Sequence, residues 1–161
     1  MDYKKLPDDT RIWIYQANRQ LTEQEIRSIR RSGQEFIDKW TAHGAKLKAA
    51  IEVFHNRFVI LFADEKQANA SGCSIDKSVR FITGIERELD ITLLDRKLIT
   101  YREGENIQTC THEEFSELLN NGKITASTVV FNNLIAKKGE LESLWQIPLK
   151  DSWHREIFIP R

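Results

Sequence analysis

Cysteine, proline and glycine are scarce in this sequence, whose 161 residues include two cysteines, three prolines and seven glycines. A disulfide framework in a secreted protein normally needs more cysteines and a signal peptide. We therefore expect both thiols, Cys73 and Cys110, to be reduced. Because flexible linkers are rich in small residues or proline, the scarcity of glycine and proline also argues against a long linker between domains.

Long apolar stretches are missing as well. The longest one, Phe58 to Ala63, is far too short to span a bilayer. The first residues, Met1 to Lys5, contain no apolar segment of the kind that forms a signal peptide. We therefore expect a soluble, cytoplasmic protein without a membrane span.

Neither sign of charge is in excess, because 24 Lys and Arg residues balance 24 Asp and Glu residues. Nucleic-acid-binding domains usually carry a basic surplus, since phosphate neutralisation supplies much of their affinity. We therefore expect no nucleic-acid partner. A hydrophobic fraction of 40% with a charged fraction of 30% is typical of a globular chain that can bury a core.

Motifs that bind nucleotides or activate a serine are absent from the sequence. It contains no Gly-x-x-x-x-Gly-Lys-Ser/Thr loop, no Gly-x-Gly-x-x-Gly and no Gly-x-Ser-x-Gly. The sequence therefore predicts neither ATP hydrolysis by a P-loop nor an α/β-hydrolase elbow, and we expect no cofactor.

The first two thirds of the chain show the patterns of strands and helices in alternation. Thr22 and Glu25 form a capping box, which predicts the start of a helix, and His43-Gly44 predicts its end. Ser74 is a good N-cap for a second helix. The expected elements are a strand at 11–16, a helix that opens at Thr22 and ends at 43–44, strands at 47–54 and 57–63 joined by a turn at 55–56, a helix from 74, and a strand at 97–102.

This order, β-α-β-β-α-β, predicts an α+β fold of the ferredoxin-like type, in which two helices cover one face of an antiparallel sheet. In the last third, Thr111 and Glu114 form a second capping box and 128–131 is expected to be a strand. We therefore predict an α+β core over residues 1–104, with a small C-terminal α/β extension over residues 105–161 packed on it.

The first candidate site is the segment that leads into the second helix. Unpaired N–H groups and the helix dipole stabilise an anion at such a position. Ser71, Gly72, Ser74 and Asp76 are therefore candidate residues for binding an anion or another ligand. The same field favours a thiolate, which makes Cys73 a candidate catalytic nucleophile. Alternatively, the segment only turns the chain and caps the helix, with Cys73 as a small buried side chain.

A nucleophilic cysteine needs a base within hydrogen-bond reach. Either His43 or His55 could supply it, provided that the fold brings one of them close to Cys73. The alternative for each histidine is an ordinary solvated residue beside a turn.

A zinc site would have to combine residues from distant parts of the chain, namely Cys73, Cys110, His112 and His154. Structural zinc sites normally show paired short spacings such as Cys-x2-Cys. The sequence has no such pair, so we expect no metal.

The tail of the chain contains a candidate interaction surface. Trp145 and Trp153 bracket Pro148 in a polar segment, and His154 follows directly. Aromatic side chains with one polar end are common at binding surfaces. We therefore expect Trp145, Trp153 and His154 to face a partner.

A resemblance to a known family is carried by five segments: 11–16, 56–58, 70–79, 130–134 and 152–154. Together they resemble an uncharacterised family of short bacterial proteins that are often labelled "ABC transporter ATPase". The resemblance covers nearly the whole chain and implies no catalytic residues. The label is a name only, because the chain lacks the glycine-rich lysine loop that an ABC ATPase needs. The segment from Glu113 to Pro148 is also similar in outline to GYF-type peptide-binding modules, without their Gly-Tyr-Phe signature.

Two functions follow from these observations. The first is a non-catalytic binding or interaction domain, because no catalytic constellation is visible and the tail is rich in tryptophan. The second is a small cysteine-dependent enzyme that uses Cys73, with the Ser71–Ser74 loop holding an anionic group. A small anionic ligand or a protein would be the partner.

Overall fold

The computed structural model describes residues 2–66 and 68–159 and divides the chain into two compact units. Unit 1 consists of Met1–Leu94 with Ala136–Gly139, and unit 2 consists of Asp95–Ile135 with Glu140–Arg161. Each unit combines helices with antiparallel strands, so the expected α+β class is confirmed. The chain passes from one unit to the next after Leu94, earlier than the expected boundary after residue 104.

The sheet of unit 1 has three antiparallel strands in the order β1-β5-β4. Their bounds are Arg11–Gln16 for β1, Lys48–Phe54 for β4 and Phe58–Asp64 for β5. The central strand β5 is buried along its whole length, as expected for an apolar strand with a neighbour on each side. His55 and Asn56 form the tight turn between β4 and β5 with positive φ angles of 53° and 55°, so this predicted turn is confirmed.

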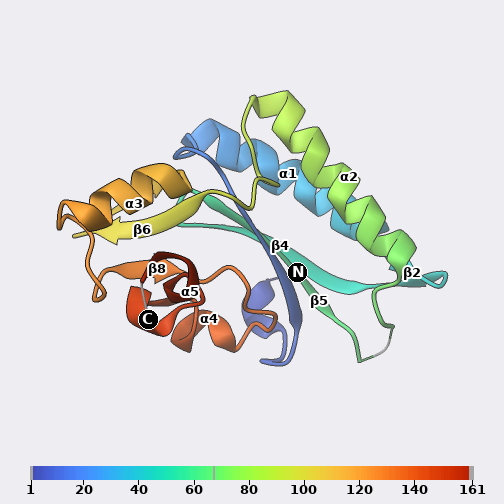
Figure 1. Ribbon diagram of the computed structural model, residues 1–161. Coiled ribbons are helices and arrows are strands. Elements are labelled where there is room, and N and C mark those ends of the chain that lie inside the picture. The colour runs from blue at the N-terminus through green and yellow to red at the C-terminus, as the bar shows by residue number, and fades with distance from the viewer. Residues whose placement is uncertain (1, 67, 160–161) are drawn as a thin grey trace. The chain divides into compact units, whose positions relative to one another are not determined.

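Two long helices cover one face of this sheet (Figure 1). Helix α1 spans Glu23–Lys39 and helix α2 spans Gly72–Leu89. Each buries an apolar stripe, because its isoleucines recur at helical spacing. The shared core combines residues of both helices with residues of all three strands: Ile26, Ile29, Ile82, Ile85, Tyr15, Val53, Val59 and Leu61.

The two helices run antiparallel to each other. A guanidinium nitrogen of Arg19, just before α1, donates to the backbone oxygen of Leu89 at the end of α2 over 3.2 Å. At the opposite end, Trp40 caps α1 and its indole N–H donates to the backbone oxygen of Ser74 in the first turn of α2. The end of α1 therefore lies beside the start of α2.

The starts and ends of these helices confirm one expectation and correct two. Thr22 and Glu25 form the predicted capping box, with N–H to oxygen distances of 2.9 and 3.1 Å. Helix α1 ends at Lys39, however, and His43 and Gly44 form the turn of a short hairpin, β2 (Thr41–Ala42) with β3 (Ala45–Lys46). The N-cap of α2 is Ser71 instead of Ser74, because the Ser71 hydroxyl accepts the N–H of Ser74.

A glycine allows α1 to lie close to the sheet. An added Cβ on Gly33 would come within 2.7 Å of a side-chain carbon of Ile51 on β4. Real Cβ atoms do not approach other carbons this closely, so any larger residue would push the helix or Ile51 away. Gly33 therefore sets the distance between α1 and the edge strand β4.

The segment Ala136–Gly139 returns to unit 1 along the free edge of β1. The backbone N–H of Ile12 donates to the oxygen of Ala136 over 2.9 Å, and Lys138 and Gly139 donate to Thr10 and Asp8. These bonds satisfy backbone groups that an open edge strand would leave to solvent.

Unit 2 is built on a second antiparallel sheet in the order β7-β6-β8-β9. Its side chains bury a core of their own, with Phe115 and Val130 at 0% exposure. Thr111 caps the first helix of the unit in the predicted box with Glu114. The elements are β6 (Ile99–Glu103), β7 (Asn106–Cys110), α3 (His112–Asn120), β8 (Val129–Phe131), α4 (Glu140–Ser143), β9 (Gln146–Pro148) and α5 (Arg155–Phe158), with one-turn helices at Tyr3–Lys5 in unit 1 and Leu149–Asp151 in unit 2.

The ferredoxin-like arrangement in its full form is not confirmed. That arrangement requires the strand expected at 97–102 to join the first sheet, whereas this strand, β6, pairs with β7 and β8. The hydrogen-bonding register joins Ile99 to Cys110 and Tyr101 to Val130. A hairpin partner only a few residues away competes well for a strand, because closing a short loop costs little entropy.

Candidate functional site

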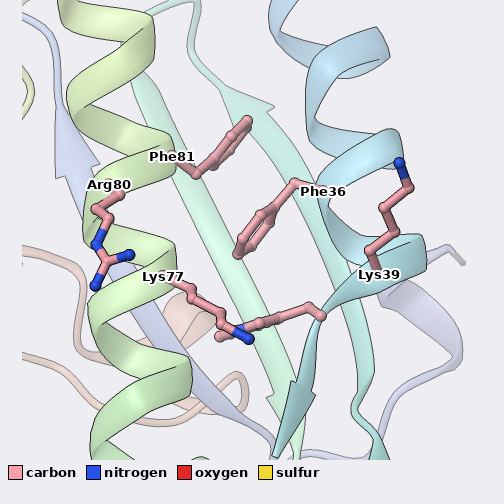
Figure 2. A pocket seen from close by; sticks show the side chains of 6 residues that line it. Phe36, Lys39, Lys77, Arg80 and Phe81 are labelled. Carbon is pink, nitrogen blue, oxygen red and sulfur yellow. The ribbon is translucent and has the colours of Figure 1, made fainter.

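A pocket lies on unit 1 between α1 and α2 (Figure 2). Its volume is about 480 Å³, which is in the range of ligand pockets. Six residues line it, three from the end of α1 and its C-cap and three from the middle of α2: Phe36, Lys39, Trp40, Lys77, Arg80 and Phe81. The antiparallel packing of the helices brings these two groups together.

The floor of the pocket is aromatic. Phe36 and Phe81 stack across the gap between the helices, with ring centroids 4.6 Å apart and an angle of 6° between the rings. Trp40 lies beside Phe36, with centroids 5.2 Å apart, and is almost fully buried. Its indole N–H is already used, because it donates to the oxygen of Ser74 over 2.8 Å. The floor therefore offers apolar contact and no free hydrogen-bond donor of its own.

The rim of the pocket is cationic. Lys39, Lys77 and Arg80 are exposed, and within residues 2–66 and 68–159 none of them forms an ion pair. Elsewhere on unit 1, Arg19 binds Glu25 and Arg30 binds Glu52, each within 2.8 Å. Figure 2 shows Lys77 extending into the space between the helices, whereas Lys39 and Arg80 extend to either side. The pocket therefore combines apolar surface with three cationic side chains that form no ion pair among the described residues.

The predicted anion-binding residues at the start of α2 act largely as a cap. The N–H groups of Ser74 and Ser71 donate to the hydroxyl of the other residue over 3.1 and 2.7 Å, and Ser74 is only 1% exposed. Gly72 has open space around it, because an added Cβ would meet no atom of the described residues within 4 Å. Asp76 is exposed on the first turns of the helix. The capping interpretation of this segment therefore accounts for both serines.

Cys73 is exposed in the first turn of α2, so the alternative in which its side chain is buried is wrong. In the described part of the chain its thiol has no hydrogen-bond or ion-pair partner. His43 lies in the hairpin turn after β2, a strand that packs against α2. No hydrogen bond joins His43 to Cys73 in the described residues.

His55 cannot be the base for Cys73, which corrects one of the predicted catalytic pairs. The residue after it, Asn56, accepts the N–H of Leu21, so this turn lies at the end of unit 1 where α1 begins. Helix α2 ends there too, since Asn18 accepts the N–H of Thr92. Cys73 lies at the other end of α2, which at 18 residues is about 27 Å long.

The predicted interaction surface in unit 2 is largely buried. Trp145 is 2% exposed, donates its indole N–H to Asn133 over 2.9 Å and packs edge-on against Phe131. His154 is also 2% exposed and stacks on Trp153, which is half-buried. Trp145 and His154 therefore stabilise the interior of unit 2 and cannot face a partner in this conformation.

Burial shifts two titratable groups of unit 2. It lowers the pKa of His154 to about 4, with a further contribution from the nearby His112, while Nδ1 of His154 lies 2.6 Å from the Ser152 hydroxyl. Burial likewise raises the pKa of the Cys110 thiol to about 11, with Glu114 adding to the shift. Within the described ranges, no three His, Cys, Asp or Glu side chains gather where they could hold a metal ion.

No protein-family model, curated protein or solved structure matches this chain. In the described residues, no helix has the length and apolar character needed to cross a membrane.

The sequence analysis missed the pocket, although each half has a visible pattern. Phe36 and Trp40, the C-cap of α1, are four residues apart, and Lys77 and Phe81 are four apart on α2, a spacing that favours one side of a helix for each pair. The signal available in the sequence was an aromatic residue directly after a lysine or arginine, at Lys39-Trp40 and again at Arg80-Phe81. Only the packing of the two helices shows that these faces meet.

Proposed function

We propose that this protein is a non-catalytic binding domain that holds an anionic ligand with an apolar body in the pocket between α1 and α2. The observation that carries the proposal is the pairing of an aromatic floor with three cations that have no ion-pair partner among residues 2–66 and 68–159. Pockets between helices that are apolar and carry a few converging polar groups are common ligand sites.

Electrostatics supports an anion as the occupant. The formal net charge of the chain is zero, whereas the residues that line this pocket include three cations and no carboxylate. A concave surface with one sign of charge and low-dielectric walls raises the local concentration of oppositely charged ligands. The volume of about 480 Å³ suits a small molecule or a single anchoring side chain of a partner.

The cysteine-dependent enzyme is the less supported alternative. It requires a base or a cation that holds the Cys73 thiolate, and the described residues give the thiol no such partner. Of the two histidines considered, His55 lies at the far end of α2. We therefore favour binding without covalent chemistry.

The experiment uses 8-anilinonaphthalene-1-sulfonate, which is anionic, apolar and fluorescent when shielded from water. Titration of the full chain should give one saturable site. The double variant Lys77→Gln/Arg80→Gln should weaken binding about tenfold, because each exposed charge contact contributes roughly 0.2–1 kcal/mol. Salt should weaken binding to the wild type more than binding to this variant.

The matched control is Arg31→Gln/Arg87→Gln, which removes the same charge from exposed positions of α1 and α2 outside the pocket. It should leave the affinity within about twofold of the wild type. An equal loss in both double variants would refute the pocket as the site, because the dye would then respond to overall charge alone.

A further inference from the structure

The stacking of Phe36 on Phe81 determines which part of each ring a ligand can reach. The rings are nearly parallel, 6° apart, with centroids separated by 4.6 Å, so each covers one face of the other. The ring normals therefore run across the gap between the helices, and the ring edges border the pocket (Figure 2). The edge of a phenyl ring carries the positive part of its quadrupole, whereas the face carries the negative part.

The charged residues that line the pocket are all cationic. Besides the two ring edges, Lys39, Lys77 and Arg80 line the pocket. The indole N–H of Trp40 already donates to the Ser74 oxygen. The negative face of a flat aromatic ligand fits against ring edges and below a guanidinium or ammonium group. An aliphatic chain of similar size has no quadrupole and would gain only from the burial of its surface.

We propose that the ligand of this pocket is a planar aromatic anion, an aromatic ring bearing a carboxylate or phosphate. This inference rests on the proposed function and specifies its ligand class. The ring lies on the edges of Phe36 and Phe81, and Lys77, which extends into the gap, pairs with the anionic group. Lys39 and Arg80, which extend to either side of the gap, add positive charge around the site.

The test is isothermal titration calorimetry of the full chain with four probes. Naphthalene-2-carboxylate is the aromatic anion, decanoate is an aliphatic anion, and naphthalene-2-methanol is the neutral aromatic. Adenosine 5′-monophosphate distinguishes a phosphate on an aromatic ligand from a carboxylate. We expect one of the two aromatic anions to bind about tenfold more tightly than decanoate and than the neutral alcohol.

The variant Phe81→Leu keeps apolar volume in the floor and removes one ring edge. Because Phe81 is half-buried, the variant should keep its fold, and its thermal unfolding is measured alongside. It should weaken the binding of naphthalene-2-carboxylate about fivefold while decanoate affinity stays within twofold.

Different results would contradict the aromatic ligand class and the proposed binding function. Decanoate binding as tightly as the aromatic anions would overturn the aromatic ligand class and leave the binding function standing. Absence of binding by all three anions would overturn both. Tight binding of naphthalene-2-methanol, equal to that of the carboxylate, would also contradict the inference, because the cations would then contribute nothing.

Discussion

Trp40 and Ser74 join the end of one helix to the start of the other through a single buried hydrogen bond, in which the indole N–H donates to the backbone oxygen over 2.8 Å. Trp40 is the C-cap of α1, and Ser74 closes the capping box of α2 with Ser71. The same indole ring lines the pocket. The geometry of the pocket and the start of α2 therefore depend on one side chain.

The variant Trp40→Phe should lower the free energy of unfolding by about 2–3 kcal/mol. It removes the bond to Ser74 and leaves a gap in a site where the ring is 1% exposed. Urea denaturation followed by circular dichroism measures the change. The control is Trp153→Phe, because the buried indole N–H of Trp153 has no hydrogen-bond partner among residues 2–66 and 68–159. Its replacement should cost less than about 1 kcal/mol, and an equal loss at the two positions would contradict this account.

Two glycines in the helices should respond to alanine in opposite directions. Gly84 lies in the interior of α2 with open space around its missing side chain, so Gly84→Ala should raise the free energy of unfolding by about 0.5–1 kcal/mol. Gly33→Ala should lower it by about 1–3 kcal/mol, because its Cβ would lie 2.7 Å from Ile51. Thermal or urea unfolding of both variants is the measurement, and destabilisation by Gly84→Ala would contradict the open environment.

The depressed pKa of His154 should make stability depend on pH in a defined window. Burial lowers this pKa from 6.5 to about 4, so between these values the unfolded chain binds a proton that the folded chain does not. The contribution is fully present above pH 6.5 and is lost as the pH falls toward 4, by on the order of 3 kcal/mol. Free energies of unfolding measured across this range should show the slope.

The variant His154→Gln should be less stable at neutral pH and should lose most of the slope between pH 6.5 and 4. The comparison is Glu25→Gln, which should change the stability at a lower pH than His154→Gln does. Arg19 donates to the Glu25 carboxylate and Thr22 adds a backbone bond, which together lower its pKa from 4.5 to about 2. The Glu25 carboxylate therefore contributes to the free energy of unfolding above pH 4.5, and this contribution is lost as the pH falls through about 2. An unchanged slope in His154→Gln would show that another group titrates there.

The two cysteines should differ strongly in their reaction with iodoacetamide near neutral pH. Cys110 is buried, and its pKa is raised from 9 to about 11, which reduces its thiolate about 100-fold. Cys73 is exposed, so mass spectrometry should find it labelled first. The enzyme alternative requires more, namely that Cys73 reacts faster than the thiol of free N-acetylcysteine. A rate no faster than that reference would remove the alternative.

Several features of the fold follow from residues that lie close together in the sequence. The capping boxes that start at Thr22 and Thr111 form as predicted, and so does the turn at His55-Asn56. Each depends on a few backbone and side-chain groups within four residues, so its energy is set locally. The sequence alone does not select the N-cap of α2, because Ser71 and Ser74 are both good N-caps and lie three residues apart. Tertiary packing decides between them by burying Ser74 against Trp40.

What the sequence alone determined is the α+β class, the apolar faces of the helices and the local caps, because these depend on the spacing of neighbouring residues. Tertiary structure decided that β6 pairs in a second sheet, that Trp145 and His154 are buried, and that His55 lies at the far end of α2 from Cys73. It also decided where the candidate site lies. Phe36 and Phe81 stack only because two antiparallel helices bury their isoleucines on one sheet, and no local pattern encodes that contact.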